Sequence, residues 1–220
     1  MSFMKSVVFD LDGVLVDASP IYAKFMKSAF NKRGYKFSMD HVLDRMIPHV
    51  VEWAGSLLPK GAKDREKLLT EISKEVRKNV AEATGCMKYQ KNIGRFLETI
   101  SKNNMLFLVT NSRYTTTQKI LERKNIKRFF KEVIAPAEKF GSKERAFAYL
   151  IKKYKLAEND VIYVGDTEKD IKVARGVGCK VIILYTPFSW DYEKYNEIKS
   201  AKPDMIVNSF DALVKALEEV

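Results

Sequence analysis

Short apolar runs alternate with helical patterns along most of this 220-residue chain, and this alternation limits the fold more than any other feature. The runs are rich in Val, Ile and Leu, as buried strands are. Between them helical spacing recurs, for example at Phe147, Leu150 and Tyr154. The alternation favours an α/β fold with a parallel sheet and helices on both faces. We expect strands at residues 5–10, 105–110, 132–135, 161–164, 180–184 and 205–207.

One stretch, residues 18–89, interrupts the alternation and holds no convincing strand. It contains apolar stripes at helical spacing, and Pro48 should kink or split the second of its helices. We therefore expect two domains. Residues 1–17 and 90–220 form an α/β core, a Rossmann-like doubly wound parallel sheet, and residues 18–89 form an inserted α-helical cap domain. From residue 18 to 90 there are 14 Lys and Arg against 8 Asp and Glu. This excess fits a cap that attracts an anionic substrate, or a solvated charged surface.

The strongest local signal is a pair of acids directly after the first expected strand. Asp10 and Asp12 follow three consecutive apolar residues, and Gly13 permits a tight turn that keeps both acids near one point. Ligands of open α/β sheets bind at the carboxyl ends of strands. Two carboxylates there repel each other unless a cation or a shared proton relieves them, and Mg²⁺ prefers such oxygen ligands. An isolated Asp-Gly would indicate only a turn, but two acids after a buried strand make that interpretation weak.

A second acidic signal follows the strand expected at residues 161–164. That strand ends in Gly165-Asp166, and Asp170 comes four residues later. Thr167 is a good cap for the next helix, which would place Asp170 in the first turn, facing the same mouth as Asp166. Asp170 alone could simply complement the helix dipole. Beside the first acidic pair, that simple interpretation of Asp170 becomes weaker.

Two weaker signals lie between these acidic pairs. Thr110 and Asn111 end a strand and offer hydroxyl, amide and backbone N–H groups that bind phosphate oxygens, although Asn111 or Ser112 could be an ordinary helix cap. Lys143 lies near an expected helix start, where a cation could neutralise Asp10 and an incoming phosphate. Lys139 is its rival for this role.

The order of these four groups resembles the haloacid dehalogenase superfamily. Asp10-Leu-Asp12-Gly13 matches its first motif, Thr110-Asn111 its second, Lys143 its third, and Gly165-Asp166 with Asp170 its fourth. The motifs extend over the whole expected core, and the insertion lies where the family carries a helical cap. The third motif departs from the Lys-Pro of the similar phosphoglycolate phosphatases, because Glu144 follows the lysine.

The resemblance implies a mechanism. Asp10 would attack phosphorus and form an aspartyl-phosphate, and Asp12 would protonate the leaving alcohol and then activate water. Asp10, Asp166 and the backbone carbonyl of Asp12 would hold Mg²⁺, with Asp170 completing or orienting the shell. The cap would close over the substrate. Charge on the transferring group would be stabilised by Thr110, Asn111 and Lys143.

Asp12 separates the relatives of this superfamily. True dehalogenases and phosphonate-cleaving members lack the second acid, so Asp12 argues for phosphoryl chemistry. Mutases similar to β-phosphoglucomutase carry a cap histidine where the nearest position here is Tyr22. We therefore expect a phosphatase of a small phosphate monoester, of the phosphoglycolate or sugar phosphate type. A phosphatase of nucleotide or nucleic-acid ends, a mutase and a non-catalytic binding protein remain the alternatives.

Composition limits partners and setting without naming them. The net charge of +11 and the pI of about 9.4 favour anionic partners, which include phosphorylated metabolites, nucleic acid and acidic surfaces, without choosing among them. With the motifs, we expect a small phosphorylated substrate rather than nucleic acid. Cys86 and Cys179 form no metal-binding pattern with the two histidines, and free thiols suit a reducing cytoplasm. No run reaches the roughly 18 apolar residues of a membrane span.

Overall fold

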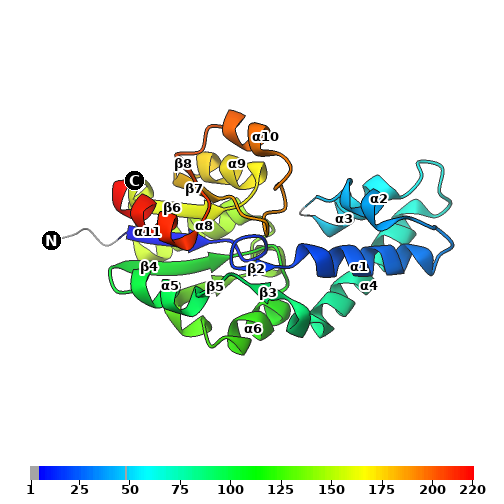
Figure 1. The fold of residues 1–220 in the computed structure, drawn as a ribbon, viewed down its shortest axis with the longest axis horizontal. Helices are drawn as coiled ribbons and strands as arrows, with labels where there is room; N and C mark the ends of the chain where they lie inside the picture. Colours follow the sequence, from blue (N-terminus) through cyan, green and yellow to red (C-terminus); the bar gives the residue numbers. More distant parts are fainter. Residues whose placement is uncertain (1–4, 48) are drawn as a thin grey trace. The chain divides into compact units, whose positions relative to one another are not determined.

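The computed structural model describes residues 5–47 and 49–220, and this part of the chain forms two compact units. One unit contains the chain up to Asp17 and from Lys88 onward, and the other contains Ala18–Met87. Each unit is described by itself below (Figure 1). None of the described helices is both long enough and apolar enough to cross a membrane.

A six-stranded sheet forms the centre of the first unit (Figure 1). Its strand order is β5-β4-β1-β6-β7-β8, and all neighbouring strands are parallel. The chain adds strands on one side of β1 up to β5 and then crosses to the other side, so the direction of winding reverses at β1. This is the switch point at which doubly wound sheets bind ligands. The strands are β1 (Lys5–Phe9), β4 (Asn104–Val109), β5 (Phe130–Ile134), β6 (Val161–Gly165), β7 (Lys180–Leu184) and β8 (Met205–Val207).

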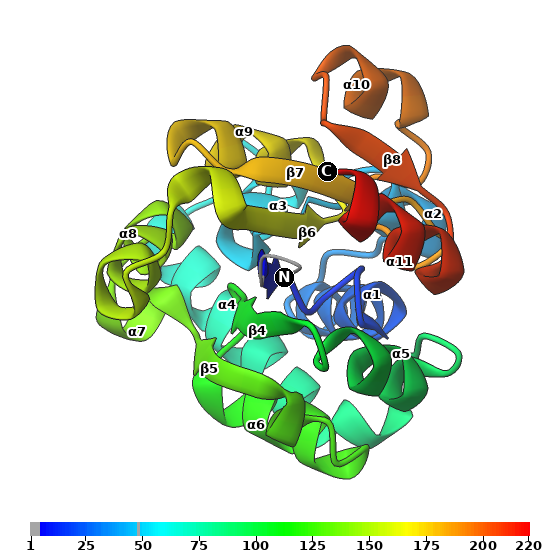
Figure 2. The same ribbon diagram turned by 90° about the vertical axis from the view of Figure 1, so that its left-hand side faces the viewer.

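Helices cover both faces of this sheet, as Figure 2 shows. On one face α8 (Lys143–Tyr154) and α9 (Glu168–Gly176) pack against each other, and on the other α5 (Ile93–Ile100) contacts α11 (Phe210–Glu219). Side chains alternate between the faces along each strand. Val8 belongs to the cluster under α8 and α9, whereas its neighbour Phe9 meets the ring of Phe96 edge-on. The remaining helices of this unit are α6 (Tyr114–Arg123), η2 (Lys127–Phe129), α7 (Pro136–Lys139), η3 (Glu158–Asp160) and α10 (Tyr195–Ser200).

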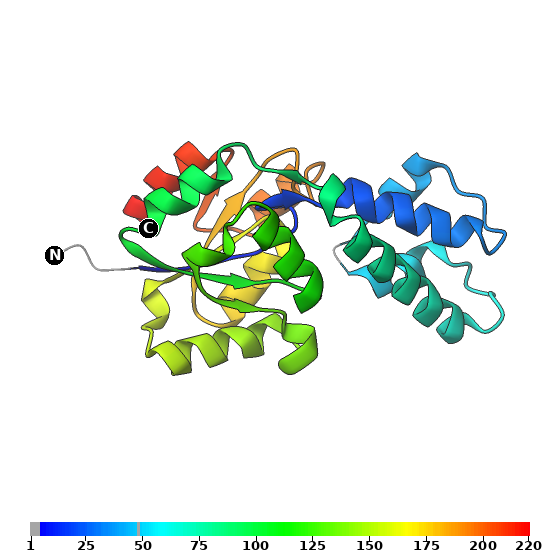
Figure 3. The same ribbon diagram turned by 90° about the horizontal axis from the view of Figure 1, so that it is seen from below.

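The second unit is entirely helical in its described residues (Figure 3). Its core includes the fully buried Phe30, Trp53 and Ile72. The ion pair between Arg33 and Glu75 (2.8 Å) joins the segment that follows α1 to α4. Pro48 lies outside the described residues, and the apolar stripe around it forms the separate helices α2 and α3. The elements are α1 (Ser19–Asn31), α2 (Met39–Leu43), α3 (Val50–Leu57), α4 (Arg65–Glu82) and η1 (Thr84–Cys86).

The predicted fold class is confirmed: the chain has an α/β core with a doubly wound parallel sheet and an inserted helical domain. The expectation that residues 18–89 hold no strand is wrong at its end. β3 (Lys88–Tyr89) pairs in antiparallel fashion with β2 (Val16–Asp17), so Lys88 and Tyr89 belong to the core unit. Two-residue strands show no alternation, and their pairing joins segments about seventy positions apart, so no local pattern announces them.

Candidate active site

Three neighbouring strands bring the predicted polar residues to one edge of the sheet. β4 ends before Thr110, β1 before Asp10, and β6 at Gly165 before Asp166. The backbone continues the ladder for one more residue, because the N–H of Asp10 donates to Val164 O (2.9 Å) and that of Thr110 to Ile134 O (3.0 Å). The acids therefore start from a rigid frame of buried strands.

Lys143 lies at the centre of the acidic group. Its Nζ donates to Asp10 Oδ2 (2.7 Å), to Asp170 Oδ1 (2.9 Å) and to the hydroxyl of Tyr163 (2.7 Å). An ammonium has three donors, so these contacts use all of them. Lys143 is the first residue of α8, whose N-cap Ser142 accepts a hydrogen bond from the N–H of Arg145. The negative charges raise the pKa of Lys143 despite its burial, so the amine stays charged.

The rival lysine lies elsewhere. Lys139 ends α7, its side chain is exposed, and its amine lies over the rings of Phe140 and Tyr149. The geometry therefore favours Lys143 for the role beside Asp10.

Asp170 has every oxygen position occupied. Its Oδ1 accepts from Lys143 and from Tyr163 (2.7 Å), and its Oδ2 accepts from the N–H of Asp166 (3.2 Å). Oδ2 also accepts from the N–H (3.1 Å) and the hydroxyl (2.7 Å) of Thr167, which caps α9 as expected. A carboxylate offers about four lone-pair sites, and Asp170 accepts five hydrogen bonds. The hydrogen bonds of Asp170 thus fix the positions of the four residues that donate to it.

Two glycines allow the acids to approach so closely. Gly13 has a φ of +85°, and a Cβ there would overlap Asp166 Oδ2. A Cβ at Gly165 would overlap the side chain of Asp170. Gly13 is therefore required for contact between the first and fourth motifs as well as for its turn, and Gly165 is required for the close approach of Asp170 within the fourth motif.

The carboxylates of Asp10, Asp166 and Asp170 form a group in which ligand atoms lie within 4.8 Å of one another. Burial raises the pKa of Asp10, against the opposing charge of Lys143, and burial with the nearby acids raises that of Asp166 well above its usual value. Burial also favours a higher pKa for Asp170, but Lys143, Thr167 and Tyr163 outweigh it and hold this pKa below the usual value. When ionised, three acids and one lysine leave two negative charges, which one divalent cation neutralises.

Asp12 lies slightly apart from this group. Its Oδ2 accepts a hydrogen bond of 2.5 Å from the Ser112 hydroxyl, and its Oδ1 is buried with no hydrogen-bond partner among the described residues. Burial raises the pKa of Asp12 to about 7, although the bond from Ser112 opposes the rise. A carboxyl group that gains and loses a proton near neutral pH suits general acid–base chemistry.

The other predicted phosphate-binding residues differ in exposure. Thr110 is fully buried, and its hydroxyl accepts from the N–H of Ser112 (3.1 Å), while the side chain of Asn111 is exposed. Ser112 and Tyr163 are not among the predicted site residues, although each lies within three positions of one. Trp190 is a further addition, because its backbone N–H donates to Asp166 Oδ2 at 2.7 Å. Trp190 comes from the loop after β7, which carries no local signal for such a contact.

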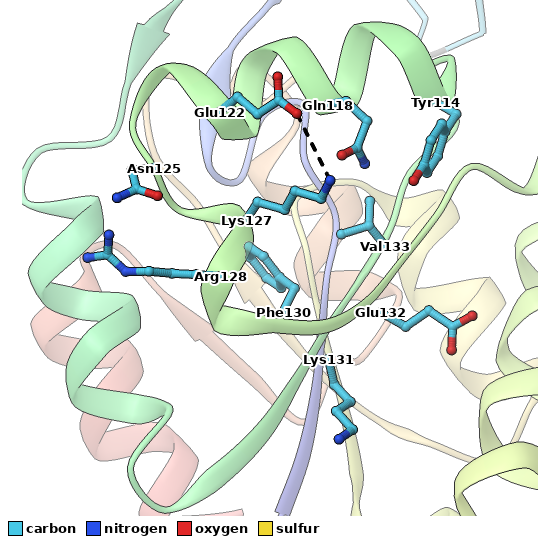
Figure 4. A pocket seen from close by; sticks show the side chains of 10 residues that line it. All are labelled: Tyr114, Gln118, Glu122, Asn125, Lys127, Arg128, Phe130, Lys131, Glu132 and Val133. Atoms are coloured by element: carbon cyan, nitrogen blue, oxygen red, sulfur yellow. Dashed lines mark ion pairs between the residues drawn. The ribbon is translucent and has the colours of Figure 1, made fainter.

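A cavity of about 680 Å³ lies between α6, η2 and β5 (Figure 4). Both basic and acidic side chains line it, including Lys127, which pairs with Glu122 at 4.0 Å. None of its lining residues belongs to the acidic group. The chemistry of the chain is therefore concentrated at the strand ends rather than in this cavity.

Comparison with known families fits this geometry. The family model described as haloacid dehalogenase-like hydrolase matches residues 7–184. The chain belongs to this family. The match runs from β1 to β7 and so includes all four motifs together with the helical insertion. The suspected resemblance is thereby confirmed.

Relatives of this haloacid dehalogenase-like hydrolase extend over almost its whole length. A protein from Vibrio cholerae named phosphoglycolate phosphatase is 27% identical over 231 residues, covering 99% of this chain and 98% of its own. One of the same name from Aquifex aeolicus is 26% identical, covering 98% and 97%. The solved structure of a haloacid dehalogenase-like family protein from Streptococcus pneumoniae has a TM-score of 0.84 at 21% identity, over 98% of this chain and 99% of that one, which shows the shared fold. The prediction of a phosphatase-type hydrolase is confirmed at the level of the family and these named relatives.

Proposed function

We propose that this hydrolase is a Mg²⁺-dependent phosphatase that cleaves a small phosphate monoester through an aspartyl-phosphate on Asp10. The observation that carries the proposal is the setting of Asp10. Its Oδ1 accepts from the N–H of Leu11 and its Oδ2 from Lys143, both at 2.7 Å, inside a buried acidic group with Asp12 two residues away. A fixed carboxylate beside a cation is suited to attack an anionic phosphoryl group.

The residues present fit a magnesium ion. Buried carboxylates with two uncompensated negative charges need a cation. Hard oxygen ligands favour Mg²⁺ over metal ions that prefer sulfur or nitrogen ligands. Asp10 and Asp166 would hold it, together with the backbone carbonyl of Asp12. Asp170 would orient the shell rather than bind directly, because its oxygens already accept five hydrogen bonds. The ion would supply charge neutralisation for the phosphoryl oxygens.

The remaining roles follow from position. Asp10 attacks phosphorus, and Asp12 gives its proton to the leaving alcohol and later takes one from the attacking water. Lys143 keeps Asp10 in place and balances charge that develops on the phosphoryl oxygens. Thr110 and the backbone N–H of Asn111 would bind those oxygens at the end of β4.

For the substrate we propose a small phosphorylated organic acid or sugar. The named relatives support phosphoglycolate as the first compound to test. The helical unit, residues 18–87, corresponds to the helical cap of the family. We propose that this unit determines which substrate is accepted. The basic charge of the chain favours anionic compounds, and Cys86 and Cys179, both free, fit a reducing cytoplasm.

The test is phosphate release from phosphoglycolate, sugar phosphates and p-nitrophenyl phosphate, with Mg²⁺ and with a chelator. Asp10→Asn should abolish Mg²⁺-dependent release and leave the circular dichroism spectrum unchanged. The exposed Asp160→Asn is the matched control and should keep full activity. Release of more than a few per cent by Asp10→Asn would exclude Asp10 as the nucleophile. A product that is an isomeric phosphate rather than free phosphate would indicate a mutase.

A further inference from the structure

Ser112 joins two parts of the site that are 100 positions apart. It lies in the turn between β4 and α6, it is buried, and its N–H donates to Thr110 Oγ1 at 3.1 Å. Its hydroxyl donates to Asp12 Oδ2 at 2.5 Å. That distance is typical of a hydroxyl bound to an ionised carboxylate, which is a strong class of hydrogen bond. The Thr110 side chain therefore helps to fix Ser112, whose hydroxyl donates to the second acid of the first motif.

The two oxygens of Asp12 differ as a result. Oδ2 is held by Ser112, while Oδ1 is buried and has no hydrogen-bond partner within residues 5–47 and 49–220. A buried polar atom without a partner costs free energy, so Oδ1 of Asp12 calls for an explanation. A hydroxyl has one proton to donate, and here it occupies Oδ2. When Asp12 carries a proton, that proton is directed to Oδ1.

We propose that Ser112 is a positioning residue that orients Asp12 so that Oδ1 exchanges the proton of the reaction; this rests on the phosphatase function proposed above. In the first step the Asp10 oxygen forms a bond to phosphorus, the bond from phosphorus to the ester oxygen breaks, and the proton of Asp12 Oδ1 moves to that oxygen. In the second step water attacks phosphorus, Oδ1 takes a proton from the water, and the bond between Asp10 and phosphorus breaks. Ser112 keeps its own proton throughout.

The proposal predicts a dependence on the leaving group. A poor leaving group, such as the alkoxide of an alkyl phosphate, needs protonation as it departs, whereas p-nitrophenolate leaves readily without it. General acid catalysis contributes about 10²–10⁴-fold where it is needed. Ser112→Ala leaves Asp12 in place but free to rotate, so it should lower kcat for alkyl phosphates by about tenfold or more and for p-nitrophenyl phosphate by less than about threefold.

The experiment measures kcat and KM of Ser112→Ala and Ser112→Thr on p-nitrophenyl phosphate and on the best alkyl phosphate. Ser112→Thr keeps the hydroxyl and should restore most of the loss on the alkyl ester. Ser101→Ala is the control, since it removes an exposed hydroxyl that donates to Glu98 O at the end of α5. Equal losses of Ser112→Ala on both esters, or no rescue by threonine, would overturn the role of Ser112. If the unaltered protein turns over neither ester, the proposed function itself fails.

A second measurement tests the contact without turnover. Urea midpoints are compared for Ser112→Ala, Asp12→Ala and the double variant, which forms a double-mutant cycle. Loss of the hydroxyl should lower the midpoint when Asp12 is present, because the buried carboxylate then lacks its donor, and should change it much less when Asp12 is absent. Additive effects would show that the two side chains do not interact and would overturn the proposal.

Discussion

Replacing Lys143 with methionine tests the electrostatic account of the site most directly. The amine lies 2.7 Å from Asp10 and 2.9 Å from Asp170, and the three side chains are exposed by only 7%, 12% and 4%. Methionine keeps an unbranched apolar chain of similar size and removes the charge. Asp10 and Asp170 then stay buried without the cation that compensates them. The fold should lose stability even before any substrate is considered.

Removing one partner of a buried ion pair costs about 3–5 kcal/mol. At about 2–4 °C per kcal/mol for a protein of this size, the Tm of Lys143→Met should fall by about 6–20 °C. The pKa of Asp170 lies below its usual value, so its ionised form stabilises the fold at neutral pH and this contribution is lost as the pH falls through that lowered pKa. The difference between the variant and the unaltered protein should therefore be largest near neutral pH and shrink in acid.

The assay is thermal unfolding followed by circular dichroism in the presence of EDTA, at about pH 7.5 and again at about pH 3.5, on either side of the ordinary carboxyl pKa range. Lys139→Met is the matched control, because Lys139 is an exposed lysine on α7 and its loss should cost less than about 0.5 kcal/mol. If the two variants unfold within about 2 °C of each other at neutral pH, the reasoning is refuted, because that gap is below 1 kcal/mol. A destabilisation that grows in acid would refute it as well.

Three further predictions use other parts of the core. Burial acts to raise the pKa of Glu132, but three donors from α8 outweigh it and lower this pKa. Glu132→Gln should therefore reduce the urea midpoint at neutral pH and change it little once acid has protonated the glutamate. Gly13→Ala should reduce activity and stability more than Gly34→Ala. Both glycines have a φ of +85°, but a Cβ at Gly13 would overlap Asp166, whereas a Cβ at Gly34 would meet no atom within 4 Å. Equal losses in the two variants would contradict the close approach of Gly13 to Asp166. Burial raises the pKa of the Cys179 thiol to about 12, so a thiol reagent near neutral pH should modify one cysteine per native chain, the exposed one, and both only after unfolding.

The strands of the core could be predicted from the sequence because each is a local signal. Six apolar runs became the six strands of the sheet, with ends that moved by no more than two residues. The pairing of β2 with β3 could not be predicted, because the whole helical unit lies between Val16 and its partner Tyr89 in the sequence. A pairing of this kind is decided by tertiary packing, which a window of neighbouring residues does not contain.

The candidate site divides in the same way. Asp10, Asp12 and Asp166 stand at strand ends, and parallel strands bring their carboxyl ends to one edge, so their convergence follows from the sequence. The contacts of Ser112 and Tyr163 do not, because each depends on the exact register of two separate segments. Lys143 could be predicted in part. Its position at a helix start follows from the sequence, but only the structure distinguishes it from Lys139.

Asp170 shows how far a motif can be interpreted without its hydrogen bonds. Spacing places it beside Asp166, and the resemblance allows it either to bind a metal or to orient the residues that do. Its five hydrogen bonds favour the second role, because a metal ion would have to displace Lys143, Tyr163 or the donor groups of Asp166 and Thr167 from its oxygens. Displacing any of them would leave a buried donor without a partner. Asp170 therefore holds the Lys143 ammonium beside Asp10 and also fixes the backbone of Asp166. One acid thus positions both the lysine and the neighbouring acid of the site.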